Sequence, residues 1–336
     1  MNSFSRLIYT VIFVGFWGIP SAVAQTVRSD IRTSNLVALN QQTEISTIID
    51  NYEQNLSCTT SAMQFTSLEN LEGYQNWQIR DRISVLLHRG IALQKLQKYH
   101  ESIVCLDRAL SLQPQSDLAW YRRGIALSRL HNYDQAFFAY NQALQLNPND
   151  YTAWYNQALA LEQLGIYSKA ISAYEAALNL NPDLYLAWYN RGKILTRLGR
   201  YEKATTAYQK AIEIKPDYSL AWYSKAHSQE QQEQLEAALS TYKKLLQIDN
   251  KQYRAWYNQG NIYLQLQQYE AALEAYQQAI ALKPDYYQAL NNQGAALEKL
   301  NRHKQALESY TDALTINSTY QKALNNRYRL LNNLHP

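Results

Sequence analysis

The chain has 336 residues, of which 46% are hydrophobic and 18% charged, and its formal net charge at pH 7 is +4. So small a charge gives little attraction for a phosphate backbone, which argues against nucleic acid as the main partner. The six histidines have no metal-site spacing, and the sequence has neither a glycine-rich phosphate loop nor a nucleophile elbow. We therefore expect no metal, no cofactor and no enzymatic activity.

Residues 1–24 have the pattern of a secretory signal. The basic residue Arg6 precedes an apolar run from Leu7 to Ile19, and small residues follow at 22–24. The run is shorter than the ~20 residues that cross a bilayer. We predict cleavage before Gln25, with an uncleaved membrane anchor as the alternative. Cleavage would leave 312 residues (336 minus 24) with a net charge of +3, after loss of Arg6 from the +4 sum.

Export would place the mature protein in the periplasm or outside the cell, or in the thylakoid lumen of a photosynthetic organism. No later stretch is apolar enough to predict a transmembrane segment.

Residues 25–82 show no repeat and are rich in Gln, Asn, Ser and Thr. The first part of this segment is predicted to be flexible. Apolar residues between Ile45 and Trp77, partly at helical spacing, supply enough area to pack on a neighbour. We expect this segment to cap the first unit of the repeat array that follows, because an end unit otherwise exposes half of its core.

Residues 83–320 consist of seven units of 34 residues. The period is plainest in five tryptophans that lie 34 residues apart. With Tyr151 as position 1, these occupy position 4, glycine or alanine occupies position 8, and a small residue occupies position 20. The tryptophans are Trp120, Trp154, Trp188, Trp222 and Trp256.

Each unit is predicted to hold two amphipathic helices. Positions 4, 8 and 11, and positions 20, 24 and 27, recur at i, i+4, i+7, which places them on one face of a helix. Gly165 and Gly199 lie where the first helix should end, since glycine adopts the left-handed conformation readily. The second helix should stop at a proline at position 32, present in five units: Pro114, Pro148, Pro182, Pro216 and Pro284.

The pattern resembles the tetratricopeptide repeat (TPR) family, through Trp at position 4, Gly or Ala at 8, Tyr at 17, Ala at 20, Tyr at 24, Ala at 27 and Pro at 32. The resemblance covers about seven tenths of the chain. It implies an all-α, right-handed α-solenoid of helix-turn-helix repeats, with a concave groove lined by the first helix of each pair. Such folds mostly bind peptides or proteins.

A ladder of tyrosines at position 5 is the predicted ligand surface. These residues follow the tryptophans and are rotated about 100° from the predicted core stripe. Positions 6 and 9 place polar donors beside them, and rigid phenol rings with amides suit an extended peptide or a saccharide-like chain. The alternative is that the rings only pack against the next repeat. The predicted groove residues are Tyr121, Arg122, Tyr155, Asn156, Tyr189, Asn190, Lys193, Tyr223, Tyr257, Asn258 and Asn261.

Lys193 and Arg197 are the centre of a basic unit, residues 185–218, with seven basic and three acidic residues. Because the two lie four apart on one helix, they share a face. They form either an anion-binding part of the groove or an ordinary solvated surface.

Residues 219–252 form an irregular fifth unit, with Gln229, Gln232, Leu235, Leu245 and Asn250 at positions that are apolar, tyrosine, alanine or proline elsewhere. This is either simple drift or a flexible point in the solenoid. Residues 321–336 are predicted to be a C-terminal capping helix, with Ala323, Leu324 and Leu331 on its apolar side and a polar outer face.

The two cysteines, Cys58 and Cys105, form a predicted disulfide, because export would place both in an oxidising compartment. Two free thiols are the alternative.

These observations predict an exported, non-enzymatic scaffold that binds a protein or peptide in the groove. A structural or assembly component of the cell envelope, docking through its ends or convex face, is the alternative. Nothing in the sequence predicts an oligomeric state.

Overall fold

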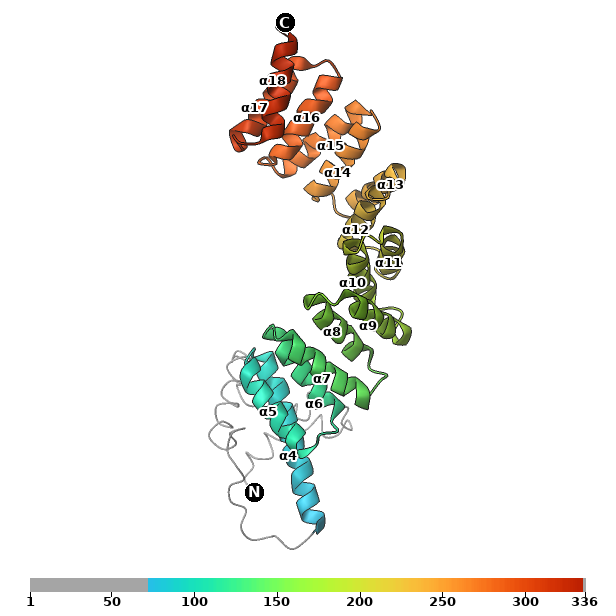
Figure 1. Cartoon of the computed structure of the whole chain (residues 1–336), viewed down its shortest axis with the longest axis vertical. Helices are drawn as coiled ribbons and strands as arrows, with labels where there is room; N and C mark the ends of the chain where they lie inside the picture. Colours follow the sequence, from blue (N-terminus) through green and yellow to red (C-terminus); the bar gives the residue numbers. More distant parts are fainter. Residues whose placement is uncertain (1–71, 335–336) are drawn as a thin grey trace, which may run out of the picture. The chain divides into compact units, whose positions relative to one another are not determined.

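The computed structural model describes residues 72–334, and these form fifteen α-helices with no strand among them (Figure 1). The predicted signal peptide, Cys58 and most of the predicted N-terminal cap lie outside the described residues. Contacts divide the chain into two units, Met1–Gln75 and Asn76–Pro336, and the repeats belong to the second. Within the described residues, no helix combines the length and hydrophobicity needed to cross a membrane.

The first helix of each repeat carries an even label. These helices are α4 (Glu72–Lys95), α6 (Asp117–Arg129), α8 (Tyr151–Gln163), α10 (Tyr185–Arg197), α12 (Ser219–Glu230), α14 (Tyr253–Gln265) and α16 (Tyr287–Lys299), and α18 (Gln321–Leu334) follows the last repeat.

The second helices carry odd labels. They are α5 (Tyr99–Leu112), α7 (Tyr133–Leu146), α9 (Tyr167–Leu180), α11 (Tyr201–Ile214), α13 (Leu235–Ile248), α15 (Tyr269–Leu282) and α17 (His303–Ile316). From α5 to α18 each helix contacts the next along the chain, so the repeats pack in tandem as an α-solenoid (Figure 1).

Helix ends follow the predicted chemistry. Gly165 and Gly199 have φ of 74° and 70° at position 15, where the first helix gives way to the turn. Five other repeats reach the same left-handed conformation without glycine, at Gln97, His131, Glu233, Gln267 and Asn301. The residue before each of the five position-32 prolines leaves the helical conformation, as at Asn181 (φ −137°, ψ 91°), where the second helix ends.

From the second repeat onward the core consists mainly of alanines and one tyrosine ring per repeat, whereas Leu106 takes the place of the ring in the first repeat. Tyrosines at position 24 are at most 1% exposed and share core clusters with buried alanines, as Tyr276 does with Ala272, Ala279 and Ala289. In the fifth repeat Leu245 replaces the alanine of position 27. In four repeats the ring lies so close to glycine at position 8 that a Cβ would come within 2.6 Å of it, as at Gly192 and Tyr208. The buried tyrosines are Tyr140, Tyr174, Tyr208, Tyr242, Tyr276 and Tyr310.

The tryptophans at position 4 do not form the core stripe, which corrects the sequence-based assignment. They are only half-buried, and the alanine before each is buried instead. The indole N–H of Trp188 donates to the carbonyl oxygen of Pro182 over 2.9 Å, and the other four tryptophans make the same bond with position 32. A ring with a polar N–H stays at the edge, where that bond can form.

Both ends of the repeat array differ in detail from the prediction. Helix α4 begins at Glu72, before the repeat period starts at Ile83, and no proline or glycine interrupts residues 74–82. In α18 the buried residues are Ala323 and Leu330, whereas Leu324 is 38% exposed. Leu324 takes the tryptophan position, which lies at the edge of the core.

Candidate functional site

The tyrosine row comprises the five position-5 tyrosines: Tyr121, Tyr155, Tyr189, Tyr223 and Tyr257. They lie on the successive first helices α6 to α14 and are half-buried. Each ring packs against the buried position-24 tyrosine of its own repeat, with centroids 5.8–6.0 Å apart. The row is therefore anchored to the core on one side.

Asparagines at position 6 join the row from one repeat to the next. The side-chain amide nitrogen (Nδ2) of Asn190 lies 3.1 Å from the phenol oxygen of Tyr155 and donates to it. Asn156 donates likewise to Tyr121, and Asn258 to Tyr223, each over 3.1 Å. These amides were predicted as donors to a ligand, but each already uses one proton on a phenol.

Asn261, at position 9 of the sixth repeat, has a similar structural role. Its side-chain oxygen accepts hydrogen bonds from the hydroxyl of Tyr276 and from the amide of Asn292, both over 2.8 Å. Asn292 also donates to Tyr257 over 3.2 Å. Sequence reasoning did not single out Asn292, although it occupies the same position 6 as Asn156, Asn190 and Asn258.

The cations predicted in the groove are already engaged. The ammonium of Lys193 lies 3.0 Å from a carboxylate oxygen of Glu162. The guanidinium of Arg197 donates to the hydroxyl of Tyr167 over 2.6 Å and lies 5.4 Å from the centroid of that ring. Arg122 extends over Tyr121, 5.9 Å from its centroid. Lys193 and Arg197 are thus held by this chain, which favours the ordinary surface over a ready anion site.

Carboxylates at position 12 are bound to the core tyrosines. The hydroxyls of Tyr174, Tyr242 and Tyr310 donate to Glu162, Glu230 and Glu298 over 2.9–3.1 Å. Burial, together with the carboxylate, raises the pKa of Tyr174 and of Tyr242 far above the usual value of 10.

Two groups of tyrosines were missed by sequence reasoning. Near the row, Tyr218 lies 5.1 Å, centroid to centroid, from both Tyr185 and Tyr189. In the same way Tyr286 lies 5.2 Å from Tyr253 and 4.9 Å from Tyr257. The signal that could have revealed them is the segment Lys-Pro-Asp-Tyr, which occurs at 215–218 and again at 283–286.

Burial raises the pKa of Tyr218 to about 12, and the neighbouring phenols of Tyr189, Tyr185 and Tyr155 add to the effect. Burial also raises the pKa of Tyr286, again with nearby phenols contributing. These hydroxyls are therefore neutral at physiological pH and keep a proton that can be donated to an acceptor.

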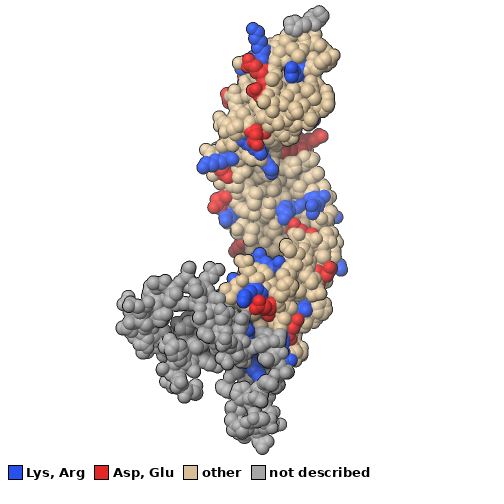
Figure 2. All heavy atoms as spheres, turned by 90° about the vertical axis from the view of Figure 1, so that its left-hand side faces the viewer, with Lys and Arg blue, Asp and Glu red and all other residues tan. Residues whose placement is uncertain are grey.

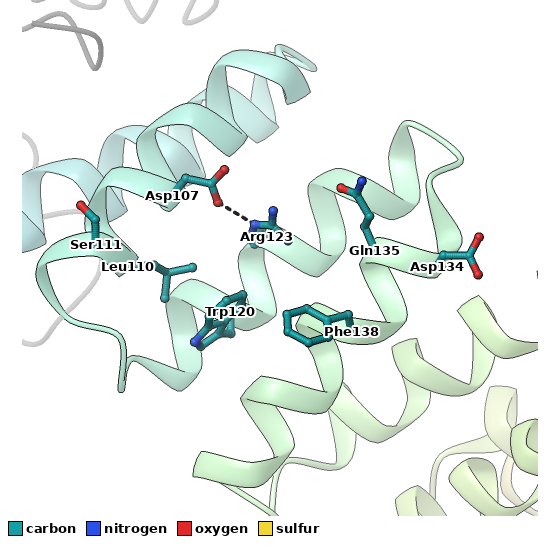
Figure 3. Close-up of a pocket in the computed structure, with 8 residues that line it drawn as sticks. All are labelled: Asp107, Leu110, Ser111, Trp120, Arg123, Asp134, Gln135 and Phe138. Carbon is teal, nitrogen blue, oxygen red and sulfur yellow. Dashed lines mark hydrogen bonds and ion pairs between the residues drawn. The ribbon is translucent and has the colours of Figure 1, made fainter.

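One hollow lies between α5, α6 and α7 (Figure 3). Its volume is about 670 Å³, and two of its lining rings, those of Trp120 and Phe138, meet edge-on with centroids 5.9 Å apart. Arg123 beside them is paired with Asp107 over 2.6 Å. Phe138 is 52% exposed, and the corresponding residue in repeats 3 to 7 is Ser, Thr or Glu.

Charges of both signs are interspersed with large uncharged areas on the face shown in Figure 2. Within the described residues, no group of three or more His, Cys, Asp and Glu side chains could hold a metal ion. Cys105 is fully buried on α5, and its predicted partner Cys58 lies outside the described residues. The disulfide therefore stays a prediction.

Comparison with family models identifies the repeats. Tetratricopeptide repeat models match residues 83–116, 118–150, 151–184, 185–218, 207–240, 253–286 and 287–320. Together they cover more than half of the chain, which belongs to the tetratricopeptide repeat family. The fifth repeat gives no match in register with the others, in line with its irregular sequence. A comparison with curated protein sequences gives no significant match.

Solved structures share the fold. The C-terminal part of a TPR repeat-containing protein from Cytophaga hutchinsonii is 18% identical, covers 71% of this chain and 98% of its own, and gives a TM-score of 0.64. YrrB, described as a TPR protein with an unusual peptide-binding site, is 24% identical, covers 55% of this chain and 95% of its own, and gives 0.51. The fold is that of a scaffold typical of protein–protein interaction.

Proposed function

We propose that this protein is a non-enzymatic scaffold, exported from the cytoplasm, that binds a protein or peptide along the face formed by its first helices. The observation that carries the proposal is the tyrosine row with the additional rings at Tyr185, Tyr218, Tyr253 and Tyr286 beside it. Rings fixed by core contacts lose little entropy when a ligand packs on them. The peptide-binding site for which YrrB is described supports the same use of this fold.

The carboxylates support a role without catalysis. Glu162, Glu230 and Glu298 are the acidic residues of position 12 on the first helices, and each accepts a hydrogen bond from a buried tyrosine. Residues held in this way serve the packing of the repeat. General acid or base catalysis needs a group that can reach a substrate and exchange a proton with it.

Export is proposed on the pattern of residues 1–24 alone. A fusion of these residues to a reporter that is active only outside the cytoplasm should give activity, and replacing the apolar run should abolish it.

The binding face can be tested by site-specific photo-crosslinking in cells that express the full chain. Leu220 lies on α12, three residues before Tyr223 and 54% exposed, so it is on the same helix face as the row. Ile248 on α13 is 42% exposed and is the matched control on a second helix. We expect a crosslinked partner from a photoreactive residue at 220 and none at 248; the reverse would contradict use of this face.

Binding of that partner is then measured with Leu220→Gln and Ile248→Gln, which leave the core intact and the net charge unchanged. We expect Leu220→Gln to weaken binding about tenfold or more with an unchanged melting temperature, and Ile248→Gln to have no effect. The double substitution Tyr189→Ala and Tyr223→Ala is less decisive, because both rings pack on core tyrosines.

The hollow at Trp120 and Phe138 favours the alternative of an envelope component that docks through the other face (Figure 3). A half-exposed phenylalanine beside a tryptophan is the kind of site that receives an apolar side chain of a partner. Crosslinks from a photoreactive residue at position 135, which also lines the hollow, lost when Phe138→Ser is introduced in the same chain, would support this function.

A further inference from the structure

Two clusters with the same composition lie two repeats apart. The first cluster contains Tyr185, Tyr189, Tyr218 and Lys215, and the second contains Tyr253, Tyr257, Tyr286 and Lys283. Every member of the second follows its counterpart by 68 residues, which is twice the repeat length. Of the seven repeats, only the fourth and the sixth combine lysine at position 31 with tyrosine at positions 1, 5 and 34.

In each cluster the lysine lies against the rings. The ammonium nitrogen of Lys215 is 5.0 Å from the centroid of Tyr185 and 5.9 Å from that of Tyr218. The ammonium of Lys283 is 5.1 Å from the centroid of Tyr253. Both lysines are half-buried. Such contacts hold the charge in place and make its position reproducible.

Among the described residues, no carboxylate lies within hydrogen-bond distance of either ammonium group. Among the described residues none lies within 4.0 Å of the Lys215 nitrogen, and Lys283 reaches only Asp285, at 4.0 Å, whose side chain is 74% exposed. Lys193 on the same face differs, since Glu162 binds it at 3.0 Å. A half-buried cation beside neutral phenol donors is complementary to a carboxylate and to backbone carbonyl oxygens.

The fifth repeat, which lies between the clusters in the sequence, has neither the lysine nor the added rings. It has Ser219 at position 1, Asp249 at position 31 and Gln252 at position 34, so an acid replaces the lysine and both added rings are missing. An acidic group of a ligand would be attracted at the two clusters and repelled between them.

We propose that the two clusters are paired subsites for an extended peptide segment of a partner protein that carries two acidic side chains, one for Lys215 and one for Lys283. This inference rests on the proposed function, because it names the ligand of the same face. The first helices α10 and α12 are in contact. Helix α13 contacts both α12 and α14 and so links the second step. With the spacing of about 8–10 Å that is usual for packed helices taken for each step, the clusters would lie ~16–20 Å apart, which about five or six extended residues span.

A selection experiment tests the chemistry without a known partner. A random library of twelve-residue peptides displayed on phage is selected against the full chain at low salt. We expect enriched peptides to carry two Asp or Glu residues separated by about four to seven positions. Enrichment of neutral or basic peptides, or no enrichment at all, would overturn the proposal.

Matched variants then test whether Lys215 and Lys283 bind the acidic side chains of the peptide. The double substitution Lys215→Gln and Lys283→Gln removes the two cluster cations, whereas Lys203→Gln and Lys304→Gln removes two exposed cations from second helices and gives the same net charge. For a selected peptide we expect the first pair to weaken binding at least about tenfold, since each charged hydrogen bond contributes substantially. The control pair should change it less than about twofold.

A peptide in which Asn or Gln replaces both acids should bind the unaltered chain more weakly than the selected peptide does. Its affinity should be the same for the unaltered chain and for the chain with the cluster substitutions. Equal losses in both double variants would show a general charge effect and overturn the paired subsites.

Failure of the inference can be told apart from failure of the proposed function by Leu220→Gln, which removes an exposed apolar side chain without adding a charge. If a selected peptide loses affinity with Leu220→Gln but not with the cluster substitutions, the face binds peptides and the paired subsites are wrong. If neither change alters its affinity, the peptide binds elsewhere, and both the subsites and the binding face are wrong.

Discussion

The phenol oxygen of Tyr155 accepts a hydrogen bond from the side-chain amide of Asn190 in the next repeat, over 3.1 Å. The bond joins the two residue types that the sequence assigns to ligand binding, and it joins them across a repeat boundary. Asn190 is 9% exposed, so its amide would be costly to leave without a partner. The tyrosine row therefore stabilises the contact between repeats as well as offering a surface.

A double-mutant cycle measures this bond. Tyr155→Phe keeps the ring and removes the acceptor, and we expect it to lower the free energy of unfolding by about 1 kcal/mol. Asn190→Ala removes the donor, and the two changes should show a coupling energy of about 1 kcal/mol in urea unfolding. Tyr151→Phe is the control, because Tyr151 is 37% exposed one helical turn away. If the changes in the free energy of unfolding caused by the two substitutions simply add, the bond contributes nothing to stability.

Replacing Glu233 by glycine should stabilise the protein. Glu233 has φ of 58° at the turn after α12, where Gly165 and Gly199 lie in their own repeats. A left-handed conformation costs a residue with a Cβ about 1 kcal/mol or more. We expect Glu233→Gly to raise the free energy of unfolding by about 0.5–1 kcal/mol, and Gly165→Glu to lower it by a similar amount. A melting temperature that falls in Glu233→Gly would contradict the assignment.

Leu330 should contribute more than Leu324 to the stability of the last repeat. Leu330 is 2% exposed where α18 packs on the seventh repeat, and Leu324 is 38% exposed on the same helix. Removing a buried leucine side chain costs about 2–5 kcal/mol. We expect Leu330→Ala to expose the seventh repeat to hydrogen exchange and Leu324→Ala to have little effect. Equal protection in the two variants would show that α18 does not cap the array through Leu330.

The repeat period was enough to predict the helix pairs, because each apolar or small residue recurs at helical spacing in several copies. Gly165, Gly199 and the prolines also marked helix ends correctly. The left-handed turns at Gln97 and Glu233 were not foreseen, since the surrounding repeat imposes a conformation that these residues do not favour by themselves.

The candidate site was predicted only in outline. The helical rotation at position 5 indicated the tyrosine row, but periodicity within one helix cannot show that Asn190 reaches Tyr155 in the preceding repeat. Nor can it show that Tyr218, which ends one repeat, packs against Tyr185 and Tyr189 of that same repeat. Such contacts depend on how successive repeats stack and on rotamers that composition does not determine.

The predicted disulfide can be tested on protein made in an oxidising compartment. A bond between Cys58 and Cys105 would close a loop of 47 residues (105 minus 58) and stabilise the fold by ~3–4 kcal/mol on chain-entropy reasoning. We expect no reactive thiol in denaturant before reduction and two after it. Two thiols before reduction would exclude the bond. Cys58→Ser should cost as much stability as Cys58→Ser combined with Cys105→Ala, because either breaks the same link.

Alkaline pH should unfold the protein through its buried tyrosines. Burial raises the pKa of Tyr208 to about 12, against 10 for an exposed phenol, and it raises the pKa of the other position-24 tyrosines as well. A raised pKa means that the folded state keeps the proton longer than the unfolded state. The stabilisation is therefore fully present below pH 10 and is lost as the pH rises from 10 towards the folded pKa.

For Tyr208 the loss should be about 1.4 kcal/mol per pH unit between pH 10 and 12. Urea unfolding at pH 9, 10 and 11 measures how the free energy of unfolding falls with pH, and absorbance at 295 nm counts the phenolates that form. We expect the exposed tyrosines to ionise first, and the six buried at position 24 to ionise only together with loss of helical circular dichroism. Tyr208→Phe should lower the slope of the free energy of unfolding against pH by the contribution of one tyrosine. Tyr328→Phe, at a residue that is 70% exposed, should leave this slope unchanged. Ionisation of all tyrosines in one step near pH 10, with the helices intact, would show that these rings are open to solvent and are not the core of the repeats.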